Sequence, residues 1–153
     1  RLSRPRVQGR PGNSRAWYYL GNEGLRVGAY DAAIDAYRQA IAGGGHPLSA
    51  YHARYYIAVC QFLRERHHDA LAAADAAIAI DPRYAEAHCL RGDIHLLLEA
   101  PLAAADDYRR ALDCGGPPPD AVFAVDPACY HDYPASRLAW LAAHRTIEGT
   151  TER

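Results

Sequence analysis

The sequence predicts an all-α fold, a right-handed superhelix of about three helical hairpins followed by a trailing helix. One observation is a pattern that occurs three times: an aromatic or apolar helix, a turn, and an Ala-rich helix that ends in Ala-Ile or Ala-Leu. The other is spacing, because the step from Ala77-Ile78 to Ala111-Leu112 is 34 residues. A fixed period of this length indicates stacked helical repeats.

Small residues stand at one equivalent place on the first helix of each hairpin, at Gly21, Ala58 and Gly92. A side chain larger than a methyl group would hold the two helices apart there, so we expect close helix packing. The corresponding small residues of the second helices are Ala33, Ala70 and Ala104. We expect Tyr37 and Tyr108 to supply bulk on the facing side.

The domain boundaries follow from the repeats and from the Pro- and Gly-rich runs. We expect a flexible linker over residues 1–13 and three repeats within 14–116, namely 14–47, 48–82 and 83–116. After them we expect a Pro-rich irregular segment over 117–134, a trailing helix over 135–146 and a tail over 147–153. The step from Trp17 to its equivalent Arg54 is 37 residues, three more than the period of 34. We place the three additional residues in the run Gly43-Gly44-Gly45-His46-Pro47.

Composition excludes several function classes. The net charge of −1 argues against a nucleic-acid groove, which requires a concentrated basic field. No apolar stretch approaches the roughly 18 residues of a membrane span, and no secretion leader is seen. We therefore expect a cytoplasmic protein. All 17 basic residues are arginine, which suggests a bacterial, high-GC origin, and the absence of methionine suggests a piece of a longer chain.

No metal site or cofactor is expected from the four cysteines. They form no C-x-x-C pair, so the usual zinc-ligand spacing is missing. A disulfide between Cys114 and Cys129, which flank the Gly115–Pro119 break, is the alternative to free thiols, and a reducing cytoplasm disfavours it.

No catalytic residues are expected either. We place His67-His68 in the turn of the second hairpin and Asp106-Asp107 on the solvated side of an amphipathic helix. The chain has no D-x-D motif, no G-x-S-x-G elbow and no phosphate-binding loop of the P-loop type. The sequence therefore predicts a segment that is not an enzyme by itself.

The candidate binding site is the concave wall, which first helices line in stacked hairpins. By spacing, we assign to this groove Arg15, Tyr18, Asn22, Arg26, His52, Tyr55, Glu86 and Asp93. Aromatic rings together with polar groups of both charges suit an extended peptide or a carbohydrate. The alternative is that some of these aromatic residues pack against a neighbouring hairpin or another domain, and spacing alone allows both.

The period and its small and aromatic positions resemble the tetratricopeptide repeat (TPR) family. Co-chaperones of this family bind a C-terminal carboxylate with basic and asparagine side chains on the same surface. Only Asn22 matches that set in this chain. The other clamp positions are occupied by Tyr18, Tyr56, Glu86 and Leu90. The resemblance therefore implies an interaction module but not one that binds chaperone tails.

A more particular resemblance involves residues 10–21, 55–61 and 119–130, which include Arg15-Ala16-Trp17 and Phe123. The first two stretches are similar to the entry and the second repeat of the helical repeats found C-terminal to bacterial family 2 glycosyltransferase domains. The third is similar to the segment that follows those repeats. The resemblance implies an accessory region behind a catalytic domain, which would be its partner together with that domain's acceptor substrate. The alternative function is a free-standing TPR adaptor that binds a protein or peptide partner.

Overall fold

The computed structural model describes residues 13–45, 47–121 and 125–150. Within these ranges the chain forms helices and connecting loops and contains no strand, which confirms the predicted all-α class. The chain divides into two compact units, Arg1–Ile80 and Asp81–Arg153.

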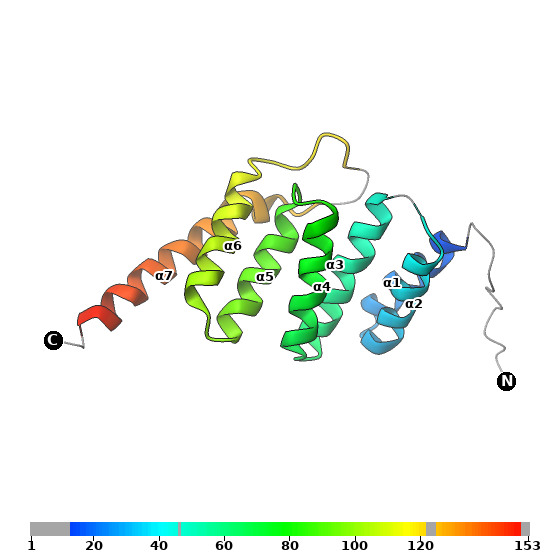
Figure 1. Ribbon diagram of the computed structural model, residues 1–153, viewed down its shortest axis with the longest axis horizontal. Coiled ribbons are helices and arrows are strands. Elements are labelled where there is room, and N and C mark those ends of the chain that lie inside the picture. The colour runs from blue at the N-terminus through cyan, green and yellow to red at the C-terminus, as the bar shows by residue number, and fades with distance from the viewer. Residues whose placement is uncertain (1–12, 46, 122–124, 151–153) are drawn as a thin grey trace. The chain divides into compact units, whose positions relative to one another are not determined.

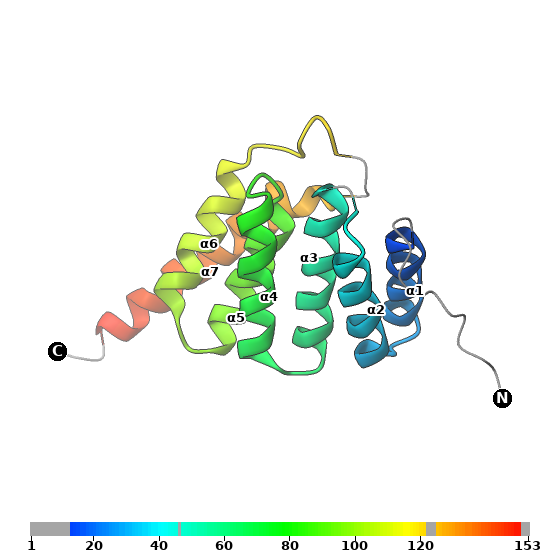
Figure 2. The same cartoon turned by 45° about the vertical axis from the view of Figure 1, so that its right-hand side comes forward.

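The first unit consists of two hairpins. The helices are α1 (Ser14–Arg26), α2 (Tyr30–Ala42), α3 (Pro47–Leu63) and α4 (His67–Ile80). Helix α1 packs along α2, α3 packs along α4, and α2 also contacts α3 (Figures 1 and 2). The hairpin interfaces are lined by alanine, with Ala33, Ala58 and Ala70 fully buried.

The second unit consists of one hairpin and a C-terminal cover. The hairpin is α5 (Ala85–Leu97) with α6 (Pro101–Asp113), and the cover is the short helix η1 (Pro127–Tyr130) with α7 (Asp132–Thr150). Helix α7 packs on α6, as Figure 2 shows.

Helix α7 begins three residues before the predicted start at residue 135 and extends past residue 146. We predicted that the Pro-rich irregular segment would extend to Pro134. Pro134 instead lies in the first turn of α7, where a backbone N–H would have no partner within the helix.

The three hairpin turns share one backbone geometry. Gly28, Glu65 and Glu99 have positive φ angles of 79°, 60° and 57°. In each turn the next residue donates its N–H to a carbonyl of the preceding helix, for example Ala100 to His95 at 2.8 Å. These bonds satisfy carbonyl groups that a helix end leaves without partners.

This geometry corrects the predicted position of His67-His68. The turn takes up only Arg64–Arg66, so both histidines are the first residues of α4. His67 is half-buried, with its ring 6.4 Å from that of Phe62, whereas His68 is exposed.

A glycine of the first helix faces a tyrosine of the second in the first and third hairpins. A Cβ atom on Gly21 would lie 2.5 Å from the Tyr37 ring, and one on Gly92 would lie 2.7 Å from the Tyr108 ring. Each tyrosine hydroxyl donates to the residue after the glycine, Asn22 or Asp93. Both tyrosines are fully buried, so the predicted close packing at these glycines is confirmed.

Candidate functional site

One face of α5, the first helix of the third hairpin, holds a later segment of the same chain. Residues 126–133, hereafter the docked segment, lie along it. Glu86 accepts hydrogen bonds from the Asp126 backbone N–H at 3.0 Å and from the Tyr130 hydroxyl at 2.8 Å. The Cys89 thiol donates to the Cys129 carbonyl oxygen at 3.3 Å.

Tyr130 is the most deeply buried residue of the docked segment. It is fully buried and packs with Ala85, Cys89 and Ala111. Burial is the main cause of a raised pKa of its hydroxyl, and the hydrogen bond to Glu86 is the second cause. The hydroxyl therefore remains a proton donor at neutral pH. Further along α5, Asp93 accepts hydrogen bonds from the hydroxyls of Tyr133 and Tyr108.

The predicted groove residues Glu86 and Asp93 therefore bind a segment of their own chain. The sequence signal for this arrangement was weak, because the docked segment follows a Pro-rich run that lacks helical periodicity. Tyr130 and Tyr133, spaced three residues apart beside Cys129, were the available indication.

In the first unit, Tyr18 and Asn22 belong to an aromatic cluster. Tyr18 is 7% exposed, and its ring meets that of Tyr37 edge-on at a centroid distance of 5.9 Å. Tyr37 also stacks on Tyr56 at 5.7 Å and donates to Asn22 at 2.7 Å. Burial raises the pKa values of Tyr18 and Tyr37.

Two further predicted residues are on α3. His52 is buried, with its ring edge-on to that of Tyr51 at 4.9 Å. Tyr55 is half-buried and stacks on Tyr51 at 6.3 Å. Tyr55 is therefore partly accessible at the surface of α3.

The two predicted arginines of α1 are exposed. Arg15 donates to the Tyr19 hydroxyl at 3.2 Å, and Arg26 forms an ion pair with Glu23 at 2.8 Å. The eight predicted groove residues are thus divided between the units, with six in the first and Glu86 and Asp93 in the second.

A buried ionic cluster in the third hairpin escaped the sequence prediction. Asp107 is 2% exposed, so its assignment to the solvated side of α6 was wrong, whereas Asp106 is exposed. Asp107 Oδ1 accepts a hydrogen bond from Arg91 Nε at 2.8 Å, and its Oδ2 lies 2.5 Å from His95 Nδ1.

A comparison of equivalent repeat positions could have found this cluster. The positions of Arg91, His95 and Asp107 are occupied by Leu20, Gly24 and Ala36 in the first hairpin and by Ile57, Gln61 and Ala73 in the second. Only the third hairpin has polar side chains at all three positions, which indicates that they pair with one another. The predicted amphipathic pattern considered α6 alone and therefore missed the partners on α5.

The cysteines form no disulfide, and all four thiols are free. Burial raises the pKa of Cys60 to about 11, which keeps it a protonated thiol. Hydrogen bonding to Cys129 and burial raise the pKa of Cys89. Among the residues that the structure describes, no group of three or more His, Cys, Asp or Glu side chains could hold a metal ion. In the same part of the chain, no helix is long and apolar enough to cross a membrane.

The sequence profile of the tetratricopeptide repeat matches residues 5–47, 21–85 and 64–120. The chain therefore belongs to the tetratricopeptide repeat family and is a helical protein-interaction module. No curated protein sequence matches it.

Solved TPR structures share the fold. The first TPR of Spaghetti (RPAP3), solved with the HSP90 peptide SRMEEVD, is 19% identical with a TM-score of 0.69, covering 92% of this chain and 98% of that chain. The Sgt2 TPR domain from Aspergillus fumigatus is 20% identical with a TM-score of 0.69, and the match covers 98% of this chain and 89% of that domain's chain. MamA is 15% identical with a TM-score of 0.63, and the match covers 92% of this chain and 82% of the MamA chain. At these identities the likeness concerns the fold alone.

Proposed function

We propose that this chain is a non-catalytic adaptor whose first two hairpins bind an extended peptide segment of a protein partner. The observation that carries the proposal is the face of α5, where Glu86, Cys89 and Asp93 hold the docked segment through backbone and side-chain hydrogen bonds. Repeats with the same backbone present equivalent positions in the same way.

The equivalent positions of the first unit supply the binding surface. They are Arg15, Tyr18 and Asn22 on α1, and His52, Tyr55 and Val59 on α3. Tyr18 and His52 are buried and form the floor, whereas Arg15, Asn22 and Tyr55 are exposed or half-buried and can contact a ligand. Aromatic and arginine side chains are frequent energetic anchors of protein interfaces.

Chaperone-tail binding is not part of this proposal. Tyr18 and Tyr56 belong to the aromatic cluster of the first unit, and Glu86 is bonded to the docked segment. We propose a cytoplasmic location, which the four free thiols support.

Selection from a displayed peptide library tests the proposal. Peptides that bind the wild-type chain should bind Tyr55→Ala and Arg15→Ala at least about tenfold more weakly, the loss expected for an anchor worth roughly 1.4 kcal/mol or more. Tyr30→Ala and Arg38→Ala, on the second helix α2, are matched controls and should bind normally. Equal binding by all four variants would contradict the proposed surface.

A second proposal places the chain behind a family 2 glycosyltransferase domain, where it would position the acceptor or mediate assembly. It is supported by the sequence resemblance at residues 10–21 and 55–61. The third resembling stretch includes residues 122–124, which lie outside the described residues.

The parent enzyme tests this second proposal. Deleting the repeats should impair transfer to the acceptor more than hydrolysis of the sugar nucleotide, because the region supplies acceptor positioning and no donor site. Equal acceptor kinetics with and without the repeats would exclude the accessory role. Sugar-nucleotide turnover by the purified 153-residue chain, in proportion to its concentration, would contradict the non-catalytic assignment itself.

A further inference from the structure

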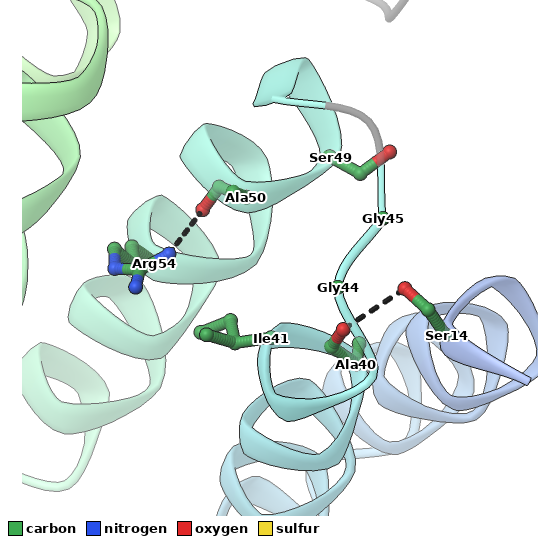
Figure 3. A pocket seen from close by; sticks show the side chains of 8 residues that line it. All are labelled: Ser14, Ala40, Ile41, Gly44, Gly45, Ser49, Ala50 and Arg54. Atoms are coloured by element: carbon green, nitrogen blue, oxygen red, sulfur yellow. Dashed lines mark hydrogen bonds between the residues drawn. The ribbon is translucent and has the colours of Figure 1, made fainter. Parts of the chain in front are cut away.

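A small cavity opens beside the loop between α2 and α3 in the first unit. Its volume is about 130 Å³. This is well above the roughly 10–15 Å³ that a single water molecule requires. Figure 3 shows Arg54 on one side and Ser49, Gly44 and Gly45 on the loop side.

Arg54 gives this cavity a positive charge. It is the one charged residue among the described residues that line the cavity. Its Nη1 donates to the Ala50 carbonyl oxygen on the same helix at 3.3 Å. Arg64 and Arg66, which follow the C-terminal end of α3, both pair with Asp31, at 3.5 and 2.7 Å. Arg54 pairs with no carboxylate in the part of the chain that the structure describes.

The residue at the Arg54 position differs in kind from its equivalents in the other two hairpins. The equivalent residues are Trp17 and His88, so the other two hairpins place a ring there, half-buried and buried respectively. The narrow arginine stem fills less space than a ring. Gly44 and Gly45 on the opposite wall have no side chain to occupy the remainder.

Further groups on the wall suit an anion. Ser49 brings a hydroxyl group from the first turn of α3, and the N-terminal end of that helix carries a partial positive charge. Ser14 closes the cavity from α1, and its hydroxyl donates to the Ala40 carbonyl oxygen at 2.9 Å, which holds the wall in place. A guanidinium group and a hydroxyl are common donors to carboxylate and phosphate oxygens.

We propose that the Arg54 cavity is a binding site for a small oxyanion, either phosphate or a carboxylate. The guanidinium of Arg54 supplies the charge and the fork of N–H donors, and Ser49 supplies a further hydroxyl. The site is independent of the proposed peptide surface, because Arg54 and Ser49 are not among the residues assigned to that surface.

Titration of the 15N-labelled chain, monitored by NMR at constant ionic strength, tests the proposal. Sodium phosphate and sodium acetate are the two probes, since they represent the two sources of an oxyanion. We expect saturable shifts of the Gly44, Gly45 and Ser49 amides and of Arg54 Nε with at least one probe, and the probe that saturates first identifies the preferred oxyanion. Shifts that stay linear with both probes, or that spread equally over the exposed arginines, would overturn the proposal.

Variants localise the binding. Arg54→Gln should abolish saturation, whereas Arg38→Gln, which removes an exposed arginine of α2, should leave it unchanged. Circular dichroism checks that each variant is folded. If Arg54→Gln does not fold, Ser49→Ala decides, because loss of a hydrogen bond to a charged group should weaken binding about tenfold. Unchanged affinity in the deciding variant would overturn the assignment.

Discussion

Asp107 shows how one residue can set the interface of a hairpin. A buried carboxylate is costly unless it is paired and hydrogen-bonded, and Arg91 and His95 provide the partners. Such a pair contributes less net stability than its short distances suggest, because both charges lose water. The pair has a larger effect on which arrangement forms, because any shift of α6 along α5 would separate the charges and leave them buried without partners. We infer that the cluster fixes the register of α5 and α6.

Replacing Asp107 by alanine should destabilise the protein by about 3 kcal/mol, because the Arg91 guanidinium would remain in the interface without its carboxylate. Asp106→Ala is the matched control one residue away, and it should change stability by less than about 0.5 kcal/mol. Urea denaturation of both variants measures the difference. Equal midpoints would show that the cluster has no structural role.

Gly92 illustrates the opposite requirement, a position where nothing larger than hydrogen fits. A Cβ atom there would lie 2.7 Å from the Tyr108 ring. The ring has little freedom to move, since it is fully buried and its hydroxyl is bonded to Asp93.

Gly92→Leu should therefore lower the free energy of unfolding by roughly 1 to 3 kcal/mol through overpacking. Gly116→Leu is the control, because a Cβ atom on Gly116 would meet nothing within 4 Å. Thermal denaturation compares the two. An unchanged melting temperature for Gly92→Leu would contradict the assigned helix pairing.

At the scale of elements, the repeat period predicted the hairpins well because each hairpin solves the same local packing problem. The small residues Gly21, Ala58 and Gly92 were sufficient to locate the helix contacts. Features that occur in a single repeat were missed, because they depend on partners distant in sequence. Asp107 required a view of α5, and the occupation of Glu86 required knowing the path of the docked segment.

The groove illustrates the same limit. Spacing placed eight residues on one set of helix faces, and it could not tell that the chain covers two of them itself. Glu86 is bonded to Tyr130 and Asp93 to Tyr133, contacts that join positions 44 and 40 residues apart. The assignment of the remaining residues to a ligand surface stays a prediction.

The hairpin turns offer a test of backbone geometry. Glu99 adopts a left-handed conformation, which costs a non-glycine residue roughly 1–2 kcal/mol. A glycine at this position would avoid that cost, but its greater freedom in the unfolded chain would cost about 0.4–1 kcal/mol of conformational entropy. Glu99→Gly should therefore stabilise the protein by about 0.5–1 kcal/mol. Gly28→Ala, at the equivalent turn of the first hairpin, should have the opposite sign. Chemical denaturation measures both, and a destabilised Glu99→Gly variant would refute the shared turn geometry.

At the scale of the whole molecule, the two units complete their cores differently. The first unit joins two hairpins through the packing of α2 on α3. The second unit has one hairpin, which η1 and α7 cover with Tyr130 on α5 and Leu141 on α6. The C-terminal helix is therefore part of the fold of the second unit.

A chain that ends at Gly116 should lose more helix than the removed residues account for, because Ala85, Ala111 and Tyr108 would lose their cover. A chain that ends at His144 keeps Tyr130 and Leu141 and is the matched control. Far-UV circular dichroism, expressed per residue, measures the helix content of both. Equal values per residue would show that α5 and α6 are stable without the cover.

The glycine and tyrosine that face each other in the first and third hairpins also constrain how such a sequence can diverge. In the second hairpin the equivalent positions are Ala58 and Ala74, both fully buried, so two methyl groups stand where the other hairpins have a hydrogen atom and a tyrosine ring. Passing from one arrangement to the other by single substitutions leads through either a steric clash or a void. The two sites are therefore energetically coupled. Duplication or recombination of whole hairpins would carry both residues together and avoid the unfavourable intermediate.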